Sequence, residues 1–203
     1  MPAGRYVILG DDGEPVGSEE FRCAPGPVGW RYFSNIKTVE PLPHDEIVDV
    51  VVDAQWRPVR VRIETGPHQL ILEADGDHLR GFRDRTPVET PWSDAMHVDY
   101  LSPSFNAITC RRLTETTEID VVFIQPYTLE PVSERQRYEL LGDEPVLTLV
   151  GTFDATRWRY TALSSGWTAD LWAAGDVVVK YDRLFDLEWY DPGASGVRPQ
   201  APA

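Results

Sequence analysis

The stretch that decides the fold is Val98-Asp99-Tyr100-Leu101-Ser102-Pro103-Ser104-Phe105-Asn106-Ala107-Ile108-Thr109-Cys110-Arg111-Arg112-Leu113. Ser102 can cap a helix, and Pro103 suits the first helical position, where no backbone N–H is needed. Leu101, Phe105 and Ile108 fall on one helical face. The basic pair comes in the last turn, where cations interact favourably with the negative helix end. The sequence predicts a short central helix over residues 102–113.

Short strand-like segments lie on both sides of this helix. In Val59–Glu64 apolar and polar residues alternate strictly, which is typical of a half-buried strand. Turn signals such as Asp11-Asp12-Gly13 and the tripeptide Pro41-Leu42-Pro43 separate these segments. The other predicted strands are Arg5–Leu9, Glu14–Arg22, Gly29–Val39, Ile47–Asp53, His68–Glu73, His78–Phe82, Arg85–Pro91, Glu118–Gln125, Glu134–Leu140, Val146–Phe153, Arg157–Leu163, Trp167–Ala173, Val177–Tyr181 and Leu184–Tyr190.

The length of 203 residues suits one β-rich domain, which we place at residues 1–190. The Pro- and Gly-rich tail 191–203 is predicted to be disordered. A net charge of −14 disfavours nucleic acid and anionic membranes as partners. No signal peptide or membrane span is visible, so no stable membrane insertion is expected. Two cysteines are too few for a disulfide framework and indicate the cytoplasm, although one disulfide between them stays open.

An internal echo indicates two similar halves, roughly residues 5–100 and 114–190. Trp30-Arg31-Tyr32 recurs as Trp158-Arg159-Tyr160, each followed by a tight turn and a Val-rich strand. Two copies of a meander, each closing half a barrel, would leave no exposed sheet edge. The predicted fold is therefore mainly β, a single antiparallel β-barrel-like domain around a short central helix.

Three stretches carry a family resemblance. Asn106–Leu113 resembles the Asn-x-x-x-x-Arg-Arg-Leu motif of the glycolipid-binding family of bacteria. Arg135–Tyr138, with its Gln-x-Tyr, and Gly166–Leu171 are similar to that family as well. Thr109-Cys110 departs from the family pattern, and so does Trp167, where the family tends to have Phe. The resemblance implies a two-repeat barrel akin to bacterial lipoprotein-carrier folds, with a glycolipid as the ligand.

Polar residues of these motifs are the first candidates for a ligand site. Arg111 and Arg112 could bind an anionic head group through bidentate contacts. The alternative is that one arginine pairs internally with a carboxylate such as Asp99, Glu118 or Asp120, and that the other lies on the surface. Asn106 could touch a ligand or fix a turn. Gln136 and Tyr138 share a strand face, and either bind a ligand's polar end or belong to the core.

Aromatic residues of the repeated strands are the second set of candidates. Trp30, Trp158 and Trp167 could line a cavity inside the barrel, since aromatic walls bind sugars and acyl chains. The alternative is an aromatic core. Trp167 and Trp172 lie five residues apart in one strand, so they face opposite sides unless a bulge intervenes.

The sequence contains no recognisable catalytic motif. The four histidines are scattered, no metal-ligand spacing appears, and no nucleophile elbow or phosphate loop is present. We therefore expect no metal and no cofactor. The favoured function is non-catalytic intracellular binding of an amphipathic ligand, a lipid or glycolipid, in the barrel interior.

Two other functions stay open. One is an enzyme acting on a small apolar metabolite in the same cavity, with Tyr138, Asp99 or a histidine as acid or base. The other is a structural module that dimerises through Arg85–Pro91. The chain is predicted to be a monomer or a homodimer.

Overall fold

The computed structural model describes residues 1–39 and 43–200. The described chain forms 15 strands and one helix, and all the strands belong to one sheet. The elements are β1 (Ala3–Leu9), β2 (Pro15–Pro25), β3 (Gly29–Thr38), β4 (His44–Asp53), β5 (Pro58–Glu64), β6 (Gln69–Asp75), β7 (His78–Arg83), β8 (Thr86–Pro91), β9 (His97–Asp99), α1 (Pro103–Arg112), β10 (Thr117–Ile124), β11 (Pro131–Thr148), β12 (Gly151–Ala162), β13 (Thr168–Ala174), β14 (Val177–Tyr181) and β15 (Phe185–Asp191).

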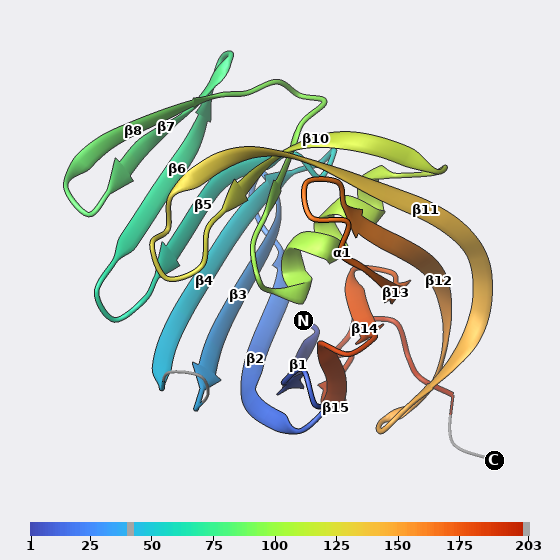
Figure 1. The fold of residues 1–203 in the computed structure, drawn as a ribbon. Helices are drawn as coiled ribbons and strands as arrows, with labels where there is room; N and C mark the ends of the chain where they lie inside the picture. The colour runs from blue at the N-terminus through green and yellow to red at the C-terminus, as the bar shows by residue number, and fades with distance from the viewer. Residues whose placement is uncertain (40–42, 201–203) are drawn as a thin grey trace.

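The sheet consists of two antiparallel meanders that meet where the first strand pairs with the last. Its order is β8-β7-β6-β5-β4-β3-β2-β1-β15-β14-β13-β12-β11-β10-β9. The pairs are antiparallel apart from β9 and β10, which run parallel. The sheet curves around α1 (Figure 1), so the predicted mainly β, barrel-like fold is confirmed. The expected closure of the barrel is not confirmed, because in the described chain β8 and β9 end the sheet and leave it open.

The central helix lies inside the curved sheet and is buried on nearly all sides. It begins at Pro103, and Ser102 caps it by accepting a hydrogen bond of 3.3 Å from Ser104 N. Every residue from Pro103 to Thr109 is buried, as expected for a helix that fills a core. Leu101 precedes the helix and is 54% exposed, so it does not share the buried face of Phe105. None of the described residues form a helix long and apolar enough to cross a bilayer.

The inward-facing apolar side chains of the strands pack against this helix and against one another. Val48, Val50 and Val52 on β4 are fully buried, and so is Ile63 on β5. Val59, predicted on the same face as Ile63, is 37% exposed, because a register shift between Val51 and Val52 displaces the start of β5. The alternation predicted from the sequence therefore holds except at the bulge.

Two boundaries in the second half differ from the prediction. The predicted strand Glu134–Leu140 is too short, because β11 continues through Gly142-Asp143 to Thr148 with a register shift between Leu140 and Gly142. Gly142 has φ 113°, a conformation that glycine adopts without strain, so the residue makes a bulge instead of a turn. The predicted strand Val146–Phe153 is interrupted by the actual turn at 149–150.

The segment after β15 is ordered further than predicted. Gln200 forms a bridge with Thr152, and Val197 packs against the core. The prediction of disorder therefore does not hold for residues 191–200. Residues 201–203, and 41–42 of the predicted Pro-Leu-Pro break, lie outside the described residues.

The two halves repeat one ion pair at the echoed tripeptides. Arg31 on β3 donates to Asp49 on β4 at 2.7 Å, and Arg159 on β12 donates to Asp170 on β13 at 2.8 Å. In both halves the tyrosine that follows the arginine is buried.

Candidate functional site

A hollow of about 630 Å³ opens at the end of the barrel where α1 begins. We call it the mouth hollow. Three turns, the segment before α1 and adjoining strand residues build it, so its wall comes from parts of the chain far apart in sequence. Its lining residues are Ile8, Leu9, Gly10, Asp11, Asp12, Val16, Ile36, Thr38, His44, Glu46, Leu101, Pro126, Tyr127, Leu184 and Phe185. The volume is within the usual range for small-molecule sites, and most of the side chains are apolar.

Large apolar side chains at the opening remain in contact with solvent. Leu101 is 54% exposed and Tyr127 is 46% exposed. Tyr127 has φ 64°, a left-handed conformation that costs a non-glycine residue about 1–2 kcal/mol. The turn is held by Leu129 N donating to Gln125 O and by Arg83 donating to Thr128 O. The fold therefore maintains a strained backbone that places an aromatic ring at the opening.

A chain of hydrogen-bonded polar groups forms one wall of the mouth hollow. Thr38 Oγ1 lies 2.7 Å from His44 Nδ1, and His44 Nε2 lies 2.8 Å from Glu46 Oε1. Tyr100 donates its phenol to Glu46 Oε2 at 2.6 Å. Burial and the Glu46 carboxylate together raise the pKa of Tyr100, so it remains a donor. Because the lining also includes Asp11, the field in the hollow is negative and disfavours an anionic head group.

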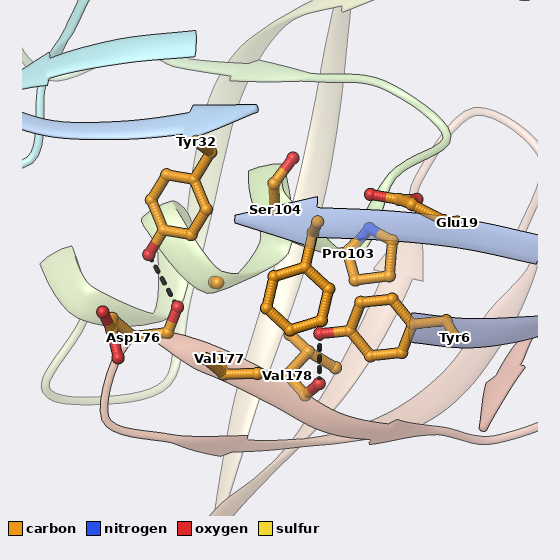
Figure 2. A pocket seen from close by; sticks show the side chains of 10 residues that line it. Tyr6, Glu19, Tyr32, Pro103, Ser104, Asp176, Val177 and Val178 are labelled. Carbon is orange, nitrogen blue, oxygen red and sulfur yellow. Dashed lines mark hydrogen bonds between the residues drawn. The ribbon is translucent and has the colours of Figure 1, made fainter. Parts of the chain in front are cut away.

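The space beneath α1 is almost filled. A cavity of only about 10 Å³ lies there, bounded by Glu19, Tyr6, Tyr32 and residues of α1 and β14 (Figure 2). Tyr6 donates to Val178 O at 2.7 Å and Tyr32 to Asp176 O at 2.6 Å. Such a volume holds at most one water molecule. The prediction of a ligand cavity at this place in the barrel is therefore wrong, because α1 and the tyrosines occupy the space.

A buried carboxyl group lies beside this small cavity. Glu19 is 0% exposed, and its Oε1 accepts a hydrogen bond of 2.7 Å from Ser102. Burial raises the pKa of Glu19 to about 7, although the hydrogen bond from Ser102 opposes this shift. The side chain thus connects the middle of β2 to the start of α1 and is easily protonated.

Three of the predicted ligand contacts lie instead in the core. Asn106 on α1 donates to the phenol oxygen of Tyr138 on β11 at 2.8 Å. Gln136 donates to Asp99 Oδ2 at 2.6 Å, and burial raises the pKa of Asp99 to about 6. These side chains are buried and none lines the mouth hollow. Their geometry anchors α1 and β9 to β11, which matches the core alternative for Gln136 and Tyr138.

The two arginines of the motif have different surroundings. Arg112 donates to Met96 O and Asp94 O, both at 2.6 Å, so it binds backbone carbonyls and not the carboxylates proposed as its partners. Arg111 is exposed and lies over the Trp56 ring, 5.0 Å from its centroid. It also lines a second hollow, of about 420 Å³, at the end of α1 far from Ser102. Of the pair, Arg111 is therefore the arginine that lines the second hollow.

The three predicted tryptophans do not form one wall. Trp158 is buried and lines the second hollow with Arg111. Trp30 packs on Trp56, with ring centroids 5.8 Å apart. Trp167 is 39% exposed and packs on Tyr160. The aromatic residues are therefore distributed between the core and separate surface positions.

The lining of the mouth hollow was missed at the sequence level. His44 and Glu46 alternate on β4, a signal for a shared face, but nothing in the sequence places Tyr127 or Leu101 opposite them. In the described ranges 1–39 and 43–200, no group of three or more His, Cys, Asp or Glu side chains could hold a metal ion.

Comparisons with known proteins agree with this fold. A DUF1089 family protein from Pseudomonas aeruginosa, solved at 1.80 Å, has a TM-score of 0.60 at 24% identity, covering 83% of this chain and 91% of that chain. A β-barrel-like DUF1849 protein from Brucella abortus has a TM-score of 0.54 at 6% identity, covering 94% and 96%. No curated protein matches. The model of the family described as "Putative glycolipid-binding" matches residues 12–185, and the chain therefore belongs to that family.

Proposed function

We propose that the protein is a non-catalytic intracellular binding protein for an amphipathic small molecule, a lipid or glycolipid. The observation that carries this proposal is the mouth hollow, which combines apolar walls with one hydrogen-bonding side. Burial of an acyl chain there would remove apolar surface of both ligand and protein from water. The family's name supports the ligand class. Both cysteines are free thiols, which supports a reducing compartment.

The lining predicts how the ligand would be oriented in the mouth hollow. Ile36, Phe185 and Leu101 would contact the apolar chain, and Thr38 and Asp11 offer hydrogen bonds to a polar head. The negative field favours a neutral or cationic head group. Ligand contacts by Arg111 and Trp158 stay a prediction, which concerns the second hollow at the other end of α1.

Native mass spectrometry and titration with an uncharged fluorescent acylglycerol test the proposal. Leu101→Glu puts a charge into the apolar wall, and because Leu101 is half exposed the fold should tolerate it. Phe82→Glu is the matched control, since Phe82 on β7 is also 54% exposed but does not line the hollow. We expect Leu101→Glu alone to lower the affinity at least tenfold. Equal affinities of the two variants, or no binding by the parent, contradict the proposal.

A second candidate function, hydrolysis of an acyl ester in the mouth hollow, is favoured by one observation. Thr38, His44 and Glu46 form a hydroxyl–imidazole–carboxylate chain in its wall, an order of groups that serves nucleophilic catalysis elsewhere. Tyr138 and Asp99, the other acid–base candidates, line neither hollow. Release of a fluorescent alcohol from an acyl ester, abolished by His44→Ala, would favour this function over simple binding.

We also propose that residues 1–190 form one domain made of two duplicated halves, supported by the repeated Arg31–Asp49 and Arg159–Asp170 pairs. A homodimer through β8, which ends the sheet, is the structural alternative. Light scattering over a range of concentrations distinguishes a monomer from that dimer.

A further inference from the structure

The end of β11 and the turn that follows it carry the two most exposed of the large apolar side chains in the described chain. Leu147 is 70% exposed and Leu149 is 75% exposed. Neither is needed for the core, because Val146 and Phe153 of the same hairpin supply the buried face. Large exposed apolar side chains at one place mark a surface that contacts something other than water.

The hairpin projects beyond its neighbours in the sheet. β10 pairs with β11 only as far as Tyr138, and β13 pairs with β12 only as far as Thr156. Residues 145–155 therefore form a two-stranded arm, paired only with each other and, at Thr152, with Gln200. An isolated hairpin is marginally stable, but this arm is braced where Phe153 packs on Tyr190, with ring centroids 5.7 Å apart.

The tip of the arm lies at the same end of the molecule as the mouth hollow. In Figure 1 the β11–β12 turn and the β1–β2 turn, which contributes Asp11 to the hollow, are both at the lower end. A surface bound by the arm would therefore face the end of the molecule at which the hollow opens. This matters because an acyl chain that leaves a bilayer for the hollow must cross as little water as possible.

Charge restricts the kind of surface. The arm contains one charged residue, Asp154, and no lysine or arginine, and the whole chain carries a net charge of −14. Attraction to anionic lipids requires basic residues near the surface, so these lipids would repel the protein. A bilayer of zwitterionic lipids imposes no such penalty and accepts leucine side chains in its interfacial region.

We propose that Leu147 and Leu149 at the tip of the arm insert into a zwitterionic bilayer and hold the mouth hollow against the membrane. This inference rests on the proposed function, because it assigns the membrane as the place where the ligand is taken up or released. The contact is peripheral and reversible, since two leucines bury little apolar surface.

Flotation with phosphatidylcholine vesicles tests the arm. The double variant Leu147→Ser, Leu149→Ser should bind vesicles about tenfold more weakly or worse. The control is the double variant Val28→Ser, Phe82→Ser, because Val28 is 55% exposed in the turn at the other end of β2. The control should float like the parent. Equal flotation of the leucine variant and the parent, or no flotation of the parent, overturns the proposal.

Two further measurements separate the alternatives. Binding of monomeric acylglycerol should be unchanged in the leucine variant. Loss of vesicle binding with intact acylglycerol binding therefore supports membrane contact by the arm, independently of the test of the mouth hollow as the ligand site. Adding phosphatidylserine should weaken flotation at low salt, and stronger flotation would contradict the charge argument. A dimer that dissociates in the leucine variant would assign the leucines to a second copy of the chain and overturn the membrane assignment.

Discussion

Ser102 Oγ lies 2.7 Å from Glu19 Oε1, so the residue that caps α1 is bonded to a fully buried carboxyl group in the middle of β2. These residues are separated by 83 positions in the sequence. The contact joins the start of the central helix to the first meander. It also makes the attachment of the helix sensitive to the protonation of one side chain.

Glu19→Gln should stabilise the protein at alkaline pH. The pKa of Glu19 is about 7 in the folded chain against an ordinary value of 4.5, so the unfolded state ionises first as the pH rises. The free energy of unfolding therefore falls by about 3 kcal/mol in total as the pH rises between these two pKa values. Above the higher pKa value this contribution is constant. Glutamine cannot ionise, so the variant should avoid this loss. Its stability relative to the parent should therefore rise between about pH 4 and pH 8.

Urea denaturation at several pH values measures this effect. Glu20→Gln, on the exposed side of β2, is the control and should follow the parent. The parent and Glu19→Gln should both retain a decline of similar size from Asp99, whose pKa is raised from 3.8 to about 6. Parallel pH profiles for the parent and Glu19→Gln would show that the carboxyl group does not titrate in this range.

Ser102→Ala should destabilise the protein more at alkaline than at acidic pH. The change removes the cap on Ser104 N and leaves Glu19 without its hydroxyl donor. We expect a loss of about 1–3 kcal/mol, since a helix cap and a hydrogen bond to a charged group disappear together. A double-mutant cycle with Glu19→Gln should reveal a coupling that an independent cap would lack.

Tyr138→Phe should reduce stability and leave ligand affinity unchanged. Without the phenol oxygen, the buried Asn106 amide loses its acceptor, at a cost of about 1–3 kcal/mol. Titration with acylglycerol and chemical denaturation on the same samples separate the two effects. A large loss of affinity at unchanged stability would restore the original prediction that Asn106 and Tyr138 contact the ligand.

Arg112→Ala should be far more damaging than Arg111→Ala. Arg112 closes the connection between β8 and β9 through two carbonyl oxygens, and charged hydrogen bonds of this kind contribute about 1.5–3 kcal/mol. Arg111 has a ring contact with Trp56, which contributes about 0.5–1 kcal/mol at an exposed site. Thermal unfolding of both variants checks the order, and Arg112→Lys should rescue little because it lacks the fork of donors.

Local chemistry explains what could be read from the chain alone. The Ser102-Pro103 start of the helix, the alternation in β5 and the Asp11–Gly13 turn depend on residues within a few positions of one another. Propensity and period determine such features, so their positions were predicted to within a few residues. The motif around Asn106–Leu113 pointed to the family for the same reason, because a short motif is visible without the fold.

The sequence by itself determined a mainly β chain organised around one short helix, together with its family. Only the tertiary structure decided that the space beneath the helix is filled, that Tyr138 bonds Asn106 in the core, and that Arg112 bonds the carbonyls of Met96 and Asp94. It also decided that turns from distant segments enclose a hollow at one end. Strand period fixes which side chains face inward, but not how much volume they fill together. That volume depends on the curvature of a 15-stranded sheet and on contacts between residues far apart in the chain.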